Sequence, residues 1–176
     1  SINLPRHFVN GKIDLKLMES TIKTAMRMLD NVIDSNLYPT IEGKTSNFRH
    51  RPVGLGIMGF HDALYELGIN FDSPEALRFA DENQEFISYH AILGSVELAK
   101  ERGVYSTFKN SKWDRGIMPV DTLALLEAER GSQIPVPKTG KMDWNFVCQQ
   151  VKMFGMRNSN TMAIAPTATI SNIAGS

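Results

Sequence analysis

Apolar residues recur every three or four positions through long stretches of this chain, which is the spacing of one buried helix face. One such stretch follows Asp14, a residue placed to cap a helix. Another begins at Ser73-Pro74-Glu75, where a capping serine, a first-turn proline and an early acid agree, and is predicted to run to Arg102. The apolar positions of the first helix are Leu15, Met18, Ile22, Ala25, Met26, Leu29, Val32 and Ile33.

The second predicted helix contains many charged residues, which we expect to be solvated. His90 lies among apolar neighbours, where a histidine is more often a core residue with satisfied hydrogen bonds than a ligand. The charged positions are Asp81, Glu82, Glu85, Glu97, Lys100, Glu101 and Arg102.

Shorter elements fill the rest of the chain. Helices are predicted at 60–67, at 121–130 and at 144–154, the last of them capped by Asp143. Loops are predicted at 36–47 and 133–140 because prolines, glycines and small polar residues gather there. The stretch 105–118 is expected to be irregular and anchored by Phe108 and Trp113.

Two short apolar runs, 53–57 and 161–165, predict buried strands. Long helices with a few short buried strands indicate an α/β fold. No internal repeat appears, and no linker is long enough to divide the chain, so residues 1–176 are expected to form one domain.

The glycines of Gly54-x-Gly56-x-x-Gly59 match the dinucleotide-binding pattern. That pattern needs a complete strand–turn–helix–strand unit with an acidic residue near the end of the next strand, and here a short helix is followed by another helix. The glycines are therefore expected to allow a neighbouring backbone to pack closely.

After the second apolar run, Pro166 leads into a hydroxyl-rich turn that opens a new helix. Thr167, Thr169 and Ser171 stand among small residues at the point where free backbone N–H groups and the helix dipole attract a phosphate. An ordinary N-cap is the alternative, and spacing alone favours it.

The composition excludes several functions. Nineteen basic and nineteen acidic residues give a formal charge of zero, and the basic residues are scattered, so no nucleic-acid partner is expected. No apolar stretch approaches the roughly 20 residues that span a bilayer, and no signal peptide opens the chain, so we expect no membrane association and a cytoplasmic protein. The scattered histidines favour no metal site.

The single cysteine, Cys148, excludes an internal disulfide. It lies in a helical pattern in which a thiol is most often a small core residue. A reactive thiol would need a basic neighbour, and the nearest lysine is Lys152. No acid–base pair or nucleophile triad appears, so no catalytic residue is predicted.

Three strings resemble the large subunit of ribonucleotide reductase in the family's own order. The opening Ser1-Ile2-Asn3-Leu4 is similar to the residues after one of its redox-active cysteines, and 51–59 (RPVGLGIMG) is similar to a strand-to-helix passage. The most specific match is MRNS at 156–159 followed by APTATISN at 165–172, which resembles the end of the catalytic barrel. These strings span nearly the whole chain.

The resemblance implies a partial ten-stranded α/β barrel, helix-rich with few short strands, that is incomplete on its own. In that family the turn holds the substrate's phosphates, here through the backbone amides of Ala168, Thr169, Ile170 and Ser171 and the hydroxyls of Thr167 and Thr169. The implied reaction uses a thiyl radical to abstract a ribose 3′ hydrogen, loses the 2′ hydroxyl as water and restores the hydrogen.

The resemblance also implies parts that this chain lacks. The radical cysteine with its Asn and Glu neighbours and the reducing cysteine are expected upstream of Ser1, and a tyrosine pair downstream of Ser176. Expected partners are the remaining portions of the large subunit, a radical-generating small subunit with a metal cofactor (alternatively adenosylcobalamin) and the ribonucleotide. A split gene, an intein, a trimmed methionine or a deliberately shortened chain would each explain the boundaries. A non-catalytic nucleotide- or phosphate-binding module, or a structural subunit of a split barrel, is the alternative function.

Overall fold

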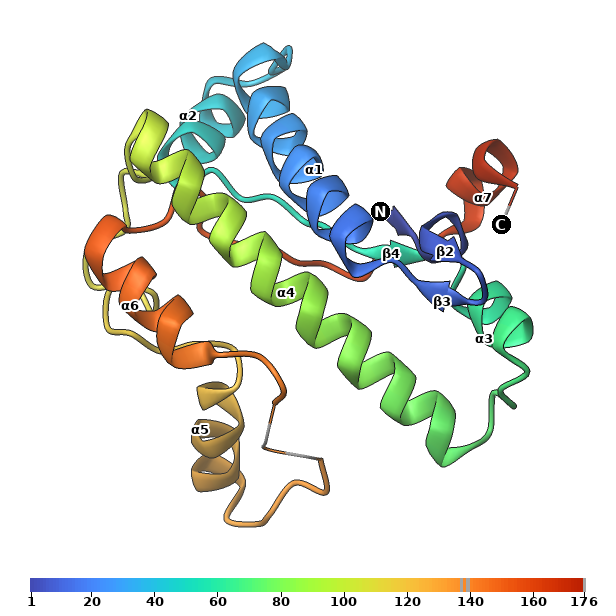
Figure 1. Ribbon diagram of the computed structural model, residues 1–176. Helices are drawn as coiled ribbons and strands as arrows, with labels where there is room; N and C mark the ends of the chain where they lie inside the picture. The colour runs from blue at the N-terminus through green and yellow to red at the C-terminus, as the bar shows by residue number, and fades with distance from the viewer. Residues whose placement is uncertain (137, 139, 176) are drawn as a thin grey trace.

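The computed structural model describes residues 1–136, 138 and 140–175, and two long helices form its centre (Figure 1). Helix α1 (Leu15–Ser35) lies beside α4 (Pro74–Arg102), and the two share a core. Both predicted caps are confirmed, because Asp14 accepts from Leu17 N and Ser73 accepts from Ala76 N. The capped starts and the regular apolar spacing explain why these two helices were predictable.

The predicted apolar stripe of α1 is confirmed at most positions but is wrong at its edges. Met18, Ile22 and Met26 are fully buried, whereas Leu15 and Val32 are more than half exposed. Leu15 lies in the first turn of the helix, and Val32 lies at the side of the stripe, since its neighbour Ile33 is buried. Asp30, in contrast, is completely buried on this stripe, and the apolar pattern did not predict it.

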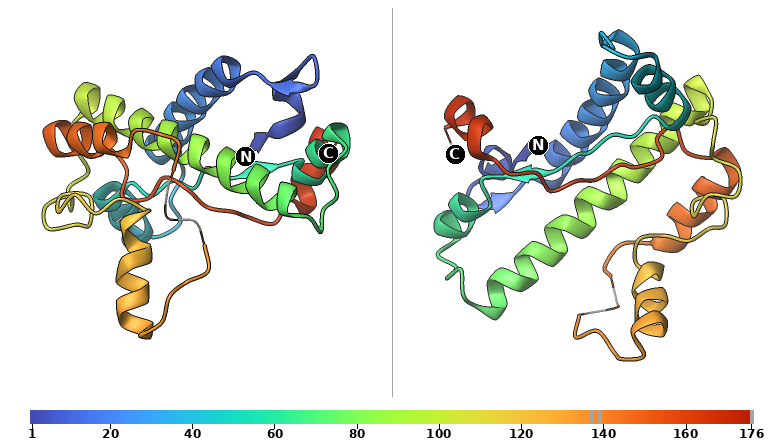
Figure 2. Two further views of the ribbon diagram at one scale, coloured as in Figure 1. Left: turned by 60° about the horizontal axis from the view of Figure 1, so that its bottom comes forward. Right: turned by 180° about the vertical axis from the view of Figure 1, so that it is seen from behind.

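A small parallel arrangement of extended segments lies against these helices. Strand β1 (Ile2–Asn3) pairs in parallel with β4 (Ile57–Met58), with Ile2 opposite Ile57. Residues 53–58, which lead into and include β4, are called the β4 segment, and on its other side Leu55 forms a parallel bridge to Met162. Seen from behind, the segment that leads to the last helix runs beside the segment that leads to β4 (Figure 2).

The strand predicted at 53–57 is found instead as β4 at 57–58, with an isolated bridge at Leu55. The prediction of a buried strand at 161–165 is wrong. Thr161 is buried and Met162 half-buried, but 163–165 are exposed. The reason is that this segment pairs along one edge only, and no other described residue covers its far side. A second, antiparallel pair joins β2 (Phe8–Val9) and β3 (Lys12–Ile13) after the 3-10 helix η1 (Leu4–His7).

The shorter helices follow the predictions with one exception. Helices α3 (Phe60–Leu67), α5 (Asp121–Arg130) and α6 (Trp144–Phe154) are confirmed. The loop predicted at 36–47 is wrong, because α2 (Ile41–His50) begins inside it. Thr40 caps α2 by accepting from Gly43 N, and a glycine in a capped first turn does not stop a helix. Of the loop at 133–140, residues 137 and 139 lie outside the described residues; the others are not helical.

Two apolar cores share α4. The first joins α1 and the first half of α4 to the extended segments, and the second joins the later half of α4 to α6 and the irregular stretch 105–118. The predicted anchors of that stretch are confirmed, since Phe108 packs edge-on against Tyr105 and Trp113 Nε1 donates to Ser159 O at 2.8 Å. The fold is helix-rich α/β, and the described residues do not close a barrel. None of their helices has the length and apolar character to cross a membrane.

Candidate phosphate-binding site

The five predicted phosphate-binding residues lie together at the start of the last helix, α7 (Ala168–Ala174). The first hydrogen bond of this helix is donated by Ser171 N to Thr167 O at 3.1 Å. The amides of Ala168, Thr169 and Ile170 precede that bond and have no acceptor within the helix. The side chains of these three residues are exposed, and Thr167 and Ser171 are half-buried. The turn therefore presents donor groups to solvent.

The hydroxyls of the turn do not all have the same role. Thr167 occupies the cap position, but its side chain accepts no bond from the helix start and its backbone is not extended (φ −94°, ψ 21°). The ordinary N-cap alternative is thus wrong for this residue. Ser171 Oγ donates to Ala168 O at 2.8 Å, so that hydroxyl proton is used inside the helix. Thr167 and Thr169 are the hydroxyls best placed for a ligand.

The turn follows an extended segment that is attached to the β4 segment by a short ladder. Val53 N donates to Asn160 O at 3.1 Å, Leu55 N to Thr161 O at 2.9 Å, and Ala163 N to Leu55 O at 3.1 Å. Only three residues lie between Ala163 and Thr167. The position of the turn is therefore set largely by this ladder.

Glycines make the ladder possible, which confirms that the Gly-rich string serves close packing. A Cβ on Gly54 would stand 2.8 Å from Ala163 Cβ, and a Cβ on Gly56 would overlap Ala163 O. Both contacts are closer than real Cβ atoms approach, so side chains at these positions would push the two segments apart. The sequence's weak resemblance to a dinucleotide motif reflects backbone packing.

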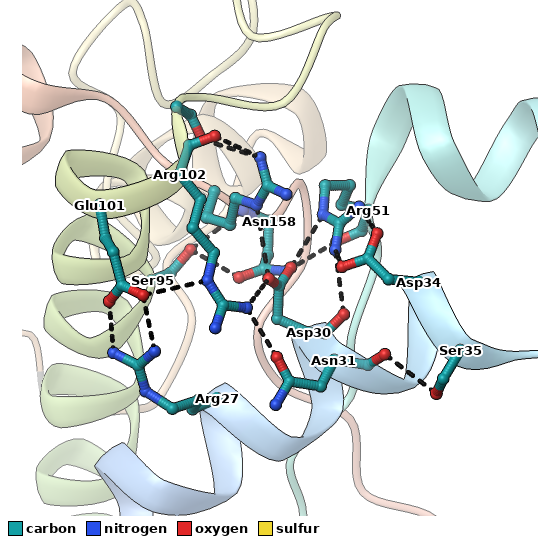
Figure 3. A network of polar contacts seen from close by, with 12 residues as sticks. Arg27, Asp30, Asn31, Asp34, Ser35, Arg51, Ser95, Glu101, Arg102 and Asn158 are labelled. Atoms are coloured by element: carbon teal, nitrogen blue, oxygen red, sulfur yellow. Dashed lines mark hydrogen bonds and ion pairs between the residues drawn. The ribbon is translucent and has the colours of Figure 1, made fainter.

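Behind the ladder, a buried polar network joins α1, α4 and the two extended segments (Figure 3). Its centre is Asp30, whose carboxylate accepts from Arg51 Nε at 2.8 Å, Asn158 Nδ2 at 3.1 Å and Arg102 Nη1 at 3.1 Å. Arg157 Nε completes the group at 3.4 Å. Arg51 and Asn158 are almost fully buried, so these charges and dipoles interact with little screening by water.

The network changes the acidity of its members. Burial is the largest influence on the pKa of Asp30 and raises it, but hydrogen bonds and charges from Arg51, Arg157 and Asn158 together outweigh burial and lower the pKa. The pKa of Asp34 is lowered chiefly by its hydrogen bond to Arg51. Burial lowers the pKa of Arg51, yet Asp34 and Asp30 raise it further than burial lowers it. All three groups are charged at neutral pH.

Two expectations for charged residues of α4 are wrong. Glu85 is not simply solvated, because it accepts from Lys141 N, Met142 N and Trp144 Nε1 at 2.9–3.1 Å and fastens the segment before α6. Arg102 is bound to Asp30 and Asn31. A carboxylate or guanidinium on a long helix can reach a neighbouring segment, and sequence spacing along one helix does not reveal this.

The histidines and the cysteine contribute no candidate chemistry. His90 is buried as predicted, but its Nδ1 has no hydrogen-bond partner among the described residues, so the expectation of a satisfied histidine is wrong. Burial lowers its pKa more than nearby Glu19 raises it. Cys148 lies half-buried in the second core with Sγ 3.6 Å from Gly116 O. Within the described residues, no group of three or more His, Cys, Asp or Glu side chains is arranged to hold a metal ion.

The turn is open to solvent in this chain. A cavity of about 230 Å³ lies at the opposite end of α7, beside Ala174 and Gly175, and is lined by Arg6 and Asp62 on neighbouring elements. Sequence reasoning found the turn but missed the buried network behind it. One signal was available: Asp30 stands one turn from Met26 and Ile33 on the same apolar stripe.

The fold and the turn define a helix-rich α/β protein with a candidate anion site at a helix start, and comparison with known proteins gives its family. Residues 1–176 match the family model of the ribonucleotide reductase barrel domain. The chain is 54% identical over 176 residues to the ribonucleoside-diphosphate reductase subunit alpha of Chlamydia pneumoniae, covering 99% of this chain and 17% of that protein.

More distant relatives agree. Identity is 43% over 178 residues to the subunit alpha of Helicobacter pylori and 38% over 177 residues to the large subunit of Trypanosoma brucei brucei, in each case covering 99% of this chain and 21% of the relative. The chain therefore belongs to the ribonucleotide reductase barrel-domain family. It spans about a fifth of the length of these relatives.

Proposed function

We propose that this chain forms part of the catalytic barrel of a ribonucleoside-diphosphate reductase and supplies the turn that holds the substrate's phosphates. The relatives that match 99% of this chain are named as that enzyme. The observation that carries the proposal is the open turn at 167–171, with three helix-start amides that have no acceptor within α7 and two threonine hydroxyls beside them.

The chemistry of the turn suits a diphosphate. The start of a helix carries a partial positive charge, and N–H groups that point outward from it donate to phosphate oxygens. In the proposed site the amides of Ala168, Thr169 and Ile170 and the hydroxyls of Thr167 and Thr169 hold the phosphates, whereas the Ser171 amide, also expected there, already donates to Thr167 O at 3.1 Å. Fixing the phosphates also fixes the ribose, and accurate placement of a reacting group is worth about 7–11 kcal/mol of barrier in the best intramolecular cases.

The reacting groups come from elsewhere. Cys148 is the only cysteine of this chain and lies within the second core, so it is not assigned to the radical or to the reducing pair. We assign those cysteines to the remaining portions of the large subunit. The described residues do not fit a metal site, so we assign the radical-generating metal cofactor to a partner small subunit, with adenosylcobalamin as the alternative.

We propose further that the catalytic domain of the complete subunit is a ten-stranded α/β barrel. Residues 1–176 form a part of that single domain. The parallel arrangement of β1, the β4 segment and 160–163 supports it, since parallel neighbours are what one half of such a barrel requires. The outer edge at 163–165 is exposed and would pair with a strand from another portion of the subunit.

The test is Thr169→Ala in a fully assembled reductase that contains this sequence. A hydroxyl bonded to a charged group contributes about 1.5–3 kcal/mol, so KM for the ribonucleoside diphosphate should rise roughly 10- to 100-fold while measurable turnover remains. Thr45→Ala is the matched control, because Thr45 is an exposed threonine on α2, far from α7 (Figure 1). Equal KM values for the two variants would exclude the phosphate assignment.

A further inference from the structure

Arg157 and Asn158 join the buried network to the segment that leads to the proposed phosphate turn, and of the two Asn158 is the one that also contacts Arg51 (Figure 3). Asn158 is completely buried, and every polar atom of its side chain is used. Its Oδ1 accepts from Ser95 Oγ at 2.9 Å, and its Nδ2 donates both to Asp30 Oδ1 and to Arg51 O at 3.1 Å. Its backbone N donates to Ser95 Oγ at 3.0 Å.

These bonds continue the ladder between the two extended segments. The bond from Asn158 Nδ2 to Arg51 O comes just before the backbone bonds from Val53 to Asn160 and from Leu55 to Thr161. The side chain thus adds a rung at the Arg51 carbonyl, beside the backbone bond from Ser159 N to His50 O at 3.0 Å. A short ladder that contains glycines and a single bridge specifies its register only weakly, so an additional buried rung at its start helps to fix the register.

The other side of this rung is itself held in place. Arg51 ends α2 in the left-handed conformation (φ +45°), which is unfavourable for a residue with a Cβ. Its guanidinium is bound by Asp30 and bidentately by Asp34 at 2.7–2.8 Å. The carbonyl that Asn158 contacts is therefore presented by a backbone that the ion pairs fix.

We propose that Asn158 is a positioning residue for the substrate site: by joining Ser95, Asp30 and the Arg51 carbonyl, it sets the register of 160–163 and thereby the position of the turn at 167–171. The inference rests on the proposed function of that turn. Asn158 does not touch substrate. Asparagine suits this place because it offers two donors and an acceptor, whereas aspartate would add a charge beside Asp30 and leucine would leave the carboxylate and carbonyl short of donors.

The experiment uses the assembled reductase with Asn158→Ala and, as a milder change, Ser95→Ala, which removes only the hydroxyl that orients Asn158. For both we expect KM for the ribonucleoside diphosphate to rise, by roughly tenfold for Asn158→Ala and less for Ser95→Ala, with kcat changed less than KM. Amide hydrogen exchange at Val53, Leu55 and Ala163 should accelerate in the same variants, because these N–H groups form the ladder.

Glu85→Gln is the control for loss of stability without displacement of the turn. Glu85 fastens the segment at 141–144, so its loss should lower the Tm and leave both KM and exchange of the ladder amides unchanged. In a Thr169→Ala background, Ser95→Ala should raise KM less than it does alone, because both changes act through one turn.

The outcomes separate the two proposals. If Ser95→Ala changed neither the hydrogen exchange of the ladder amides nor KM, the positioning role would be overturned. The same would follow if the KM increases of Ser95→Ala and Thr169→Ala simply multiplied in the double variant. If Asn158→Ala does not fold, Ser95→Ala decides. A Thr169→Ala variant with normal KM would overturn the phosphate assignment instead, and accelerated ladder exchange in Ser95→Ala would then still show that the network fixes the register.

Discussion

At the scale of single residues, charge is buried where the sequence pattern predicted apolar packing. Asp30 occupies a core position on α1, and it is tolerated there because three arginines and an asparagine satisfy its oxygens. A buried ion pair is not by itself stabilising, since desolvation offsets its attraction, but removing one partner leaves the other charge uncompensated. The apolar spacing predicted the helix and its buried face, whereas these partners come from residues up to 128 positions away.

The first residue-scale prediction concerns Asp30→Asn. The change leaves Arg51 and its neighbours with less compensation, so the free energy of unfolding at pH 7 should fall by about 3 kcal/mol. The pKa of Asp30 is lowered in the folded state, so its stabilisation is complete above the ordinary aspartate value of 3.8 and is lost as the pH falls below it. Urea unfolding of this chain at pH 7 and at pH 3 should therefore give a smaller difference between variant and original at pH 3.

Asp34→Asn is the control for that measurement. Asp34 also binds Arg51, but its side chain is 46% exposed, so water screens the pair and the loss at pH 7 should stay near 1 kcal/mol. A gap between Asp30→Asn and the original chain that does not change with pH would mean that the carboxylate's charge contributes nothing to stability.

At the scale of elements, local signals predicted most helices and failed where tertiary contacts decide. The starts of α1, α4 and α6 carry side-chain caps at Asp14, Ser73 and Asp143 and were found from sequence. Helix α2 was missed because Thr40 stands after a proline and ahead of a glycine, which together resemble a loop. The segment at 161–165 has the composition of a core strand, yet pairing on one edge only leaves 163–165 exposed.

The pairing of the extended segments gives the second prediction, Gly56→Ala. The new methyl group would overlap Ala163 O, a backbone atom that cannot rotate away, so overpacking should lower stability by about 1–3 kcal/mol and loosen the ladder. Gly94→Ala on α4 is the matched control: its Cβ would stand 3.4 Å from Met26, an ordinary contact, and alanine favours a helix interior by up to about 1 kcal/mol. The Tm should fall for Gly56→Ala and stay level or rise for Gly94→Ala. Equal changes in Tm would mean that the close approach of the two segments at Gly56 is not required.

At the scale of the whole molecule, the turn at 167–171 could be found from sequence because its residues form a continuous string, whereas its surroundings could not. Thr169 and its neighbours are exposed, and the segment before them has a bare outer edge with Ile164 two-thirds exposed. A phosphate bound at a solvent-exposed turn competes with water at every donor, so the turn needs neighbouring walls before it becomes a strong site. Those walls are not formed by the described residues, and no pattern within the chain specifies them.

This exposure leads to the last prediction, which compares the chain alone with the assembled enzyme. The isolated chain should bind a ribonucleoside diphosphate at best in the millimolar range, because a few solvated hydrogen bonds contribute little net free energy. After mixing with the remaining portions of the large subunit, calorimetry should detect much tighter binding, and Thr169→Ala should weaken it. Pairing of the edge at 163–165 should also protect the Ile164 and Ala165 amides from hydrogen exchange. Tight, Thr169-dependent binding by the chain alone would instead indicate an independent phosphate-binding module, and the need for a surrounding barrel would be wrong.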